Sequence, residues 1–236
     1  MALYVIGDTH FSEAVCKPMD IFGGRWVGAR EKLLSGLGDT LKSEDDMLVI
    51  CGDFSWGMTL EEALADFKLL AAFPGKKVLL KGNHDYWWQT MRKMVDFLQI
   101  NRLCDLQFLH NNSIFYKETA LCGTRGWFYD QNETMSAQDQ KIFLRELIRL
   151  ESSLQSARAQ KPGCEIYCFL HYPPVCGDFE ITRVTDLLKK YAVSRCFYGH
   201  LHGDGLRGAF CGNLGGVDYR AISADALGFR PVMIKP

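Results

Sequence analysis

The segment Val78-Leu79-Leu80-Lys81-Gly82-Asn83-His84-Asp85 joins a short apolar run to a dense group of polar side chains. An apolar run of this length, followed by turn-prone residues, is typical of a buried β-strand. The same arrangement recurs four times along the chain, at Asp8-Thr9-His10, Gly52-Asp53, His171 and Gly199-His200-Leu201-His202. The sequence therefore predicts five strands that each end in potential ligand side chains.

The first hundred residues alternate between strand and helix patterns. Strands are expected at 3–6, 47–51 and 77–80, and helices at 29–42, 59–72 and 86–99. Leu33, Leu37 and Leu41 form one apolar stripe, and Thr59-x-x-Glu62 is a capping box that begins the second helix. Alternation of this kind predicts a mainly parallel sheet with right-handed crossovers.

The rest of the chain is richer in strands. Strands are expected at 106–109, 113–117, 120–123, 166–170, 195–198, 205–211, 217–223 and 231–235, and helices at 137–159 and 184–190. Because no repeat, low-complexity tract or linker interrupts the sequence, we expect residues 1–236 to form a single domain.

The polar groups favour metal chemistry. In open α/β sheets, ligands bind beyond the carboxyl ends of the strands, so groups far apart in sequence can converge there. Carboxylate, imidazole and amide oxygen together suit manganese, iron, zinc or cobalt better than magnesium alone. Their number exceeds what one ion needs, which points to a two-metal hydrolytic site for phosphoryl chemistry.

The ordered set of five motifs resembles the calcineurin-like metallophosphoesterase superfamily, and it spans positions 8 to 202. The resemblance implies an α/β (α+β) fold, a four-layer α/β/β/α sandwich with two mixed sheets flanked by helices. It also implies two divalent metal ions, with manganese expected first and iron, zinc or cobalt as alternatives. A metal-bridging hydroxide would attack phosphorus in line.

The resemblance also assigns roles by position. One metal would be held by Asp8, His10, Asp53 and His202, and the other by Asp53, Asn83, His171 and His200, so Asp53 would bridge the two. His84 would stabilise the phosphoryl oxygens or protonate the leaving group, and Asp85 would orient the His84 ring.

Two differences from the protein phosphatases of the superfamily argue against protein phosphatase activity. Protein Ser/Thr phosphatases of the superfamily carry an arginine in the Gly-Asp block and Glu after Asn-His, whereas this chain has Gly52-Asp53-Phe54-Ser55-Trp56 and Asp85. The chain is more similar to small bacterial-type phosphohydrolases. We favour phosphodiester hydrolysis, with phosphomonoesterase activity nearly level. The less favoured alternatives are a DNA nuclease of the same superfamily and, from another class, a non-catalytic scaffold protein.

Two arginines and several aromatic residues are weaker candidates. Arg25 and Arg125 could each clamp the substrate phosphate or could simply stabilise their loops, and the sequence does not decide. Aromatic residues near the motifs could stack a nucleobase, although walls of a pocket or core positions are the commoner roles. They are Trp56, Tyr86, Trp87, Trp88, Trp127 and Phe128. His110, which has no ligand neighbour in sequence, is expected at the surface.

The net charge and the cysteine content of the chain limit the partners and the cellular location that we expect. The net charge of -1 gives no general attraction to nucleic acid or anionic membranes, so a polyanion would need a local basic patch. We expect a small phosphoester substrate, with nucleotides among the candidates, and neither nucleic acid nor a membrane as partner. Nine scattered cysteines without a CxxC pair, and no pattern typical of a signal peptide, predict free thiols and a cytoplasmic location.

Overall fold

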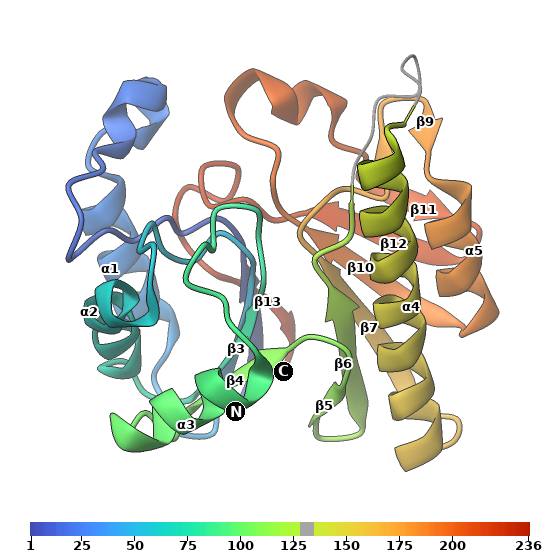
Figure 1. Ribbon diagram of the computed structural model, residues 1–236, viewed down its shortest axis with the longest axis horizontal. Helices are drawn as coiled ribbons and strands as arrows, with labels where there is room; N and C mark the ends of the chain where they lie inside the picture. Colours follow the sequence, from blue (N-terminus) through green and yellow to red (C-terminus); the bar gives the residue numbers. More distant parts are fainter. Residues whose placement is uncertain (128–134) are drawn as a thin grey trace.

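Two β-sheets pack face to face, and helices cover both outer faces (Figure 1). The structure is a computed structural model that describes residues 1–127 and 135–236. The expected α/β/β/α sandwich with two mixed sheets is confirmed. One expected aromatic residue, Phe128, lies outside the described residues.

The first sheet has the order β13-β1-β2-β3-β4. Its strands are β1 (Leu3–Ile6), β2 (Met47–Cys51), β3 (Lys76–Leu80), β4 (Leu106–Leu109) and β13 (Val232–Lys235). The strands β1 to β4 run parallel, and only β13 is antiparallel to its neighbour. The outer face of this sheet packs on α1 (Ala29–Thr40), α2 (Leu60–Ala71) and α3 (Met91–Ile100).

The second sheet has the order β11-β12-β10-β7-β6-β5. Its strands are β5 (Ser113–Tyr116), β6 (Thr119–Thr124), β7 (Glu165–Leu170), β10 (Val193–Tyr198), β11 (Gly212–Leu214) and β12 (Val217–Ala221). The four central strands are parallel, and both edge strands are antiparallel. Helices α4 (Ala137–Gln160) and α5 (Thr182–Lys190) cover the outer face, and β8 (Val175–Cys176) pairs with β9 (Phe179–Glu180).

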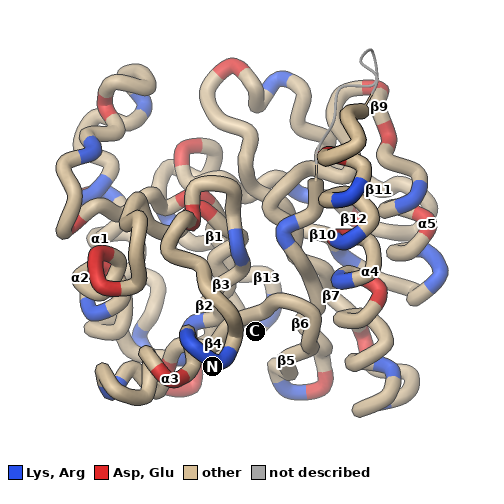
Figure 2. Tube along the Cα trace, in the orientation of Figure 1, with Lys and Arg blue, Asp and Glu red and all other residues tan. Residues whose placement is uncertain are grey.

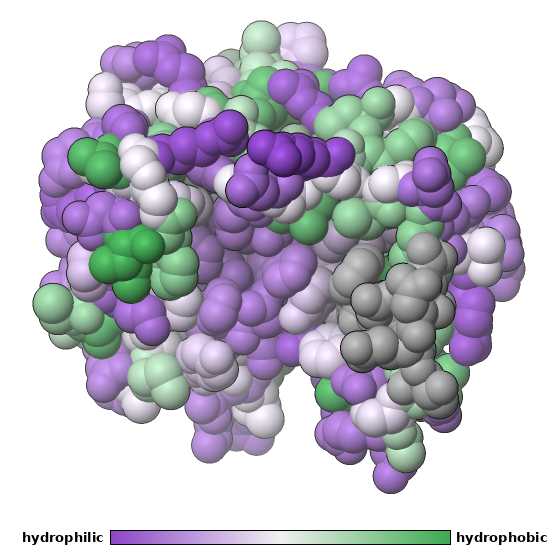
Figure 3. Space-filling view, turned by 90° about the horizontal axis from the view of Figure 1, so that it is seen from above, coloured by the Kyte–Doolittle hydropathy of each residue, from purple (hydrophilic) through white to green (hydrophobic). Residues whose placement is uncertain are grey.

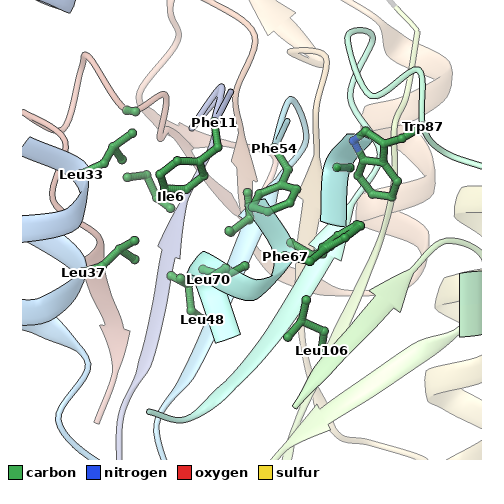
Figure 4. Packing of buried hydrophobic residues seen from close by; sticks show 14 of the residues in the cluster. Ile6, Phe11, Leu33, Leu37, Leu48, Phe54, Phe67, Leu70, Trp87 and Leu106 are labelled. Atoms are coloured by element: carbon green, nitrogen blue, oxygen red, sulfur yellow. The ribbon is translucent and has the colours of Figure 1, made fainter. Parts of the chain in front are cut away.

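Alternation along the strands explains the layers. In β1, Val5 points into the space between the sheets, where it packs in the same cluster as Phe169, whereas Ile6 points toward the helices. Figure 4 shows the helix side, where Phe67 of α2 lies close to Phe54 and Trp87. Both faces of the strands are therefore buried, as their nearly continuous apolar sequences require.

Three details differ from the sequence expectations. The helix expected over 86–99 begins at Met91, because Thr90 caps it and the preceding residues form turns. The strand expected over 205–211 is instead the 3₁₀ helix η3 (Gly203–Gly208) followed by β11. The hairpin β8–β9 was not expected. By contrast, the Thr59 cap is present, because its hydroxyl accepts a hydrogen bond from the Glu62 amide.

Residues 1–127 and 135–236 contain no helix that is both long and apolar enough to cross a membrane. All nine cysteines are free thiols.

Candidate metal centre

The carboxyl ends of the central strands of both sheets meet at the upper edge of the molecule in Figure 1. Register brings them level, since Ile6 pairs with Ile50 in the first sheet and Leu170 with Tyr198 in the second. One link crosses between the sheets, because the His200 amide lies 3.0 Å from both carboxylate oxygens of Asp8. The surface over these strand ends is mostly hydrophilic near its centre (Figure 3).

Asp8, His10 and His202 form one group of potential metal ligands, with one ligand atom from each lying within 4.8 Å of the others. The His202 Nε2 atom lies 3.5 Å from Asp8 Oδ1. Asp8 and His10 are almost fully buried. A carboxylate between two imidazoles suits an intermediate divalent cation.

Asp8, Asp53 and His171 form a second such group. One oxygen of Asp53, Oδ2, lies 3.6 Å from His171 Nε2 and 3.8 Å from His10 Nε2, so it stands between the two groups. The Asn83 Oδ1 atom is 2.6 Å from His171 Nε2, and the His200 ring centroid is 5.1 Å from that of His171. The structure thus brings together all seven side chains that the sequence predicted as ligands.

Unsatisfied polar atoms show that these residues fit cations. The His202 Nε2 and His10 Nδ1 atoms are buried and have no hydrogen-bond partner among the described residues. The His171 Nδ1 atom lies 3.1 Å from the Cys51 carbonyl, which can only accept, so Nδ1 carries the proton. The lone pair of Nε2 then faces Asn83 Oδ1, a second acceptor, at 2.6 Å, and a cation between them would bind both. Leaving such atoms buried without a partner is costly, and a cation would satisfy them.

The protonation states reflect crowding of buried charges. Burial, together with the neighbouring Asp8 carboxylate, raises the pKa of Asp53 to about 8. Burial opposes protonation of His202, but the carboxylates of Asp8 and Asp225 outweigh it and raise the pKa of His202 to about 10. Burial would raise the pKa of Asp8, yet the pairing with His202 holds it well below the usual range. Divalent cations would have to displace the protons on Asp53 and His202.

Backbone strain is concentrated at the ligands. Asp8, His10, Asp53 and His200 all have left-handed backbone conformations, with φ of 58°, 48°, 49° and 71°. They are half of the eight non-glycine residues with positive φ in the described part of the chain. Each such conformation costs on the order of 1–3 kcal/mol and is typical of functional sites, where it aims a side chain away from the strand direction.

Two glycines of the motifs make room for the ligand carboxylates. A Cβ atom on Gly82 would lie 2.0 Å from Asp53 Oδ1, and one on Gly199 would lie 2.4 Å from Asp8 Oδ2. A larger residue at either position would therefore push a carboxylate out of the cluster, which explains why these motifs contain glycine.

His84 lies at the rim of the cluster. Its ring is half-buried and lies 4.4 Å from the Trp56 ring and 5.7 Å from the His10 ring, between centroids. Burial and the nearby His171 lower its pKa. Its Nδ1 atom is buried and has no partner among the residues described here.

The expected contact between Asp85 and the His84 ring is not made. The Asp85 carboxylate instead accepts hydrogen bonds from the backbone amides of Asp53, Phe54, Ser55 and Gly82 and from the Trp87 indole. Asp85 is fully buried, and burial together with Asp53 raises its pKa to about 7. Its position indicates that it fixes the loop that carries Asp53 rather than the ring of His84.

Neither arginine predicted to clamp substrate contacts the seven ligand side chains through its described interactions. Arg25 is exposed and lines a separate hollow with Arg195 and Arg220 of the second sheet. Its neighbour Trp26 points to the cluster instead, with ring centroids 5.3 Å from His202 and 5.7 Å from His10. The Arg125 guanidinium stacks on Trp127 and lies 4.0 Å from Glu146. The substrate role of Arg25 therefore has no support from its position.

Sequence reasoning missed Asp225. Its Oδ1 atom lies 3.0 Å from His202 Nδ1, and its Oδ2 atom accepts a hydrogen bond from the Gly203 amide. This carboxylate fixes the His202 ring so that Nε2 faces Asp8. Asp225 follows β12 closely, so the rule that found the other ligands, a carboxylate just after a buried strand, would also have found it.

Comparison with known proteins places the fold and the motifs in a family. The family model for calcineurin-like phosphoesterases matches residues 1–204. Among solved structures, TT1561 of Thermus thermophilus is 12% identical with a TM-score of 0.54, and the alignment covers 99% of this chain and 97% of that one. The protein of unknown function AQ665 from Aquifex aeolicus is 17% identical with a TM-score of 0.49, covering 98% and 95%. No curated protein matches the chain.

Proposed function

Because the chain belongs to the calcineurin-like phosphoesterase family and is accordingly a metal-dependent phosphohydrolase, we propose that it hydrolyses phosphodiesters at a centre for two divalent cations. The observation that carries this proposal is the position of Asp53 Oδ2 between the Nε2 atoms of His10 and His171. A carboxylate oxygen placed in this way can bridge two ions.

The protein residues would divide the work. When bound, two divalent cations lower the pKa of an attacking water and neutralise charge on the phosphoryl oxygens. The seven ligand residues would hold them, with Asp225 fixing the ring of His202 and Asp85 fixing the loop that carries Asp53. His84, at the rim, would donate a hydrogen bond to a phosphoryl oxygen or a proton to the leaving oxygen, with in-line geometry at phosphorus.

The preference for diesters follows from charge. A phosphodiester carries one negative charge, whereas a monoester carries up to two and gains more from a bidentate arginine. The guanidinium groups of Arg25 and Arg125 make their described contacts away from the ligand side chains. A supporting cation at the rim is Lys17, whose Nζ atom lies 4.3 Å from the centroid of the Trp56 ring beside His84.

The test compares two chromogenic esters on protein loaded with manganese. We expect bis(p-nitrophenyl) phosphate to be hydrolysed with a higher kcat/KM than p-nitrophenyl phosphate, and a chelator to abolish turnover. Metal analysis of protein purified without added metal would show whether manganese is the resident ion. A higher kcat/KM for the monoester would transfer the proposal to phosphomonoesterase activity. Loss of both activities in fully loaded protein would contradict it.

A further inference from the structure

A cleft of about 570 Å³ opens next to the metal-binding cluster, between the end of β3 and the helix α4. Four cationic side chains line it, Lys81, Arg125, Arg145 and Arg149. Figure 2 shows basic segments beyond β3 and along α4, on either side of the space between the two sheets. We refer to this feature as the cationic cleft.

Among residues 1–127 and 135–236, the positive charge of the cationic cleft is only partly balanced by carboxylates. Glu146 is the carboxylate at its base, and its Oε1 atom lies 2.6 Å from Arg149 and 4.0 Å from Arg125. Its other oxygen accepts a hydrogen bond from the Thr124 hydroxyl. Among the residues that the structure describes, the cleft thus has four cations, and Glu146 is within 4.0 Å of two of them. The whole chain, by contrast, has a net charge of -1. Such an accumulation attracts anions.

Arg125 gives independent evidence of a missing partner. Its side chain is only 15% exposed, and burial lowers its pKa. Its Nε atom is buried without a hydrogen-bond partner in the part of the chain that the structure describes. A buried guanidinium donor that lacks an acceptor costs free energy, and an oxyanion in the cleft would supply one.

The cationic cleft shares its walls with the metal-binding cluster. Lys81 lies two residues before Asn83, at the end of the same strand. The Arg125 carbonyl accepts hydrogen bonds from the amides of His171 and Tyr172, at 3.1 and 3.0 Å. The Tyr172 ring in turn lies 4.4 Å from the His200 ring, between centroids. One small molecule could therefore reach both sites.

An aromatic wall completes the cleft. Trp88 lines it together with His110, and their ring centroids are 5.9 Å apart. His110, expected at the surface, is half-buried here, and burial together with Arg149 lowers its pKa to about 4, so it is neutral at pH 7. The positive charge of the cleft thus comes from lysine and arginine alone.

We propose that the cationic cleft binds a second phosphate, or a comparable oxyanion, of the same substrate whose ester is cleaved at the metal centre. The substrate class is then a phosphoester that carries an additional anionic group, and this assignment rests on the proposed function. Arginine at three of the four positions favours phosphate, because its planar fork matches two phosphate oxygens.

The experiment measures binding rather than turnover. Manganese-loaded protein is equilibrated by dialysis with adenosine 5′-monophosphate and, separately, with adenosine 3′,5′-bisphosphate. We expect the bisphosphate to bind at least about tenfold more tightly, and this ratio to fall several-fold in Arg145→Gln and in Arg149→Gln. Arg145→Lys should retain part of the ratio. Arg92→Gln, which removes an arginine of α3 with a side chain 92% exposed, is the matched control and should not change it.

The outcomes separate the two proposals. Equal affinity for both nucleotides in the unmodified protein overturns the assignment of the cleft, and so does a ratio that survives in both glutamine variants. Arg145 is exposed, so its variant is expected to fold even if removal of Arg149 disturbs Glu146. If the ratio behaves as expected but neither chromogenic ester is hydrolysed, the cleft still binds anions and the proposed hydrolase activity is what fails.

Discussion

The metal-binding cluster and the cationic cleft lie side by side, yet the sequence encodes them differently. The cluster comes from five short motifs, each placed directly after a strand. Four of its seven side chains are buried, and four have a left-handed backbone conformation. The cleft is built from single residues at 81, 125, 145 and 149, and no motif joins them. A metal site that needs ligands in fixed positions can be recognised from short sequence motifs. A group of cations that attracts an anion is brought together only by the fold.

The difference predicts two kinds of mutational response. Removing one ligand from the cluster should disable it, because the remaining buried charges are left unpaired. Removing one cation from the cleft should weaken binding by degrees, since several cations act together through a partly solvated space.

We expect the largest loss of activity on substitution of Asp53, the carboxylate proposed to bind both cations. Asp53→Asn keeps the shape of the side chain but removes the charge that two cations would share. We expect turnover of bis(p-nitrophenyl) phosphate to fall about a thousandfold, and the bound metal, measured by elemental analysis, to fall with it. Asp96→Asn, an exposed position on α3, is the control. Full activity in Asp53→Asn would sink the assignment of this carboxylate.

Substitution of His84 tests whether this residue at the rim of the cluster acts in catalysis or in metal binding. In His84→Ala we expect turnover to decrease about 10²–10⁴-fold, the range for loss of a proton donor, while the metal content stays as in the unmodified protein. Loss of metal together with activity would instead make His84 part of the ligand set.

Asp225 tests the fixing of His202. Asp225→Asn should lower the affinity for manganese about 10–100-fold, as for other carboxylates that orient a ligand histidine. Asp218→Asn, at an exposed residue paired with Asn213, is the matched control. Competition with a fluorescent chelator gives both values, and equal affinities in the two variants would show that the contact is incidental.

The pH dependence of metal affinity, for which we expect the smallest effect, tests the protonation states of Asp53 and His202. In the metal-free protein the pKa of Asp53 is raised to about 8 and that of His202 to about 10, so both side chains are protonated at pH 7. Binding must release these protons, so affinity should rise with pH, by roughly tenfold per pH unit for each proton released. Calorimetry at pH 6.5 and 7.5 in buffers of different ionisation enthalpy measures the release. An affinity that is flat over this interval would contradict the assigned protonation.

The sequence predicted what is local. The strands β1, β2, β3, β7 and β10 and the ligand positions after them follow from apolar runs and the residues that end them. Diesterase preference stays a prediction that rests on the positions of Arg25 and Arg125. The identity of the metal and the cytoplasmic location also stay predictions.

What the sequence could not give depends on contacts between distant segments. Asp85 was assigned to His84, its neighbour in sequence, but its carboxylate turns to the amides of residues 53–55 from another strand end. The sequence leaves Arg25 open between a substrate contact and a loop-stabilising role, and the short helix that carries it points Trp26 inward and leaves Arg25 exposed. Glycines at 203, 205 and 208 favour the 3₁₀ turn over the expected strand.

The ligand set has a mechanical consequence. Strands of one sheet lead into Asp8, His10, Asp53 and Asn83, whereas strands of the other lead into His171, His200 and His202. Cations bound by residues from both sheets would cross-link the two sheets of the sandwich at one edge. Each such ion would stabilise the native protein by about 2.7 kcal/mol at a free concentration one hundred times its dissociation constant. Resistance to heat and to proteases would then follow the supply of metal in the cell, and scarcity would shorten the lifetime of the protein as well as silence it.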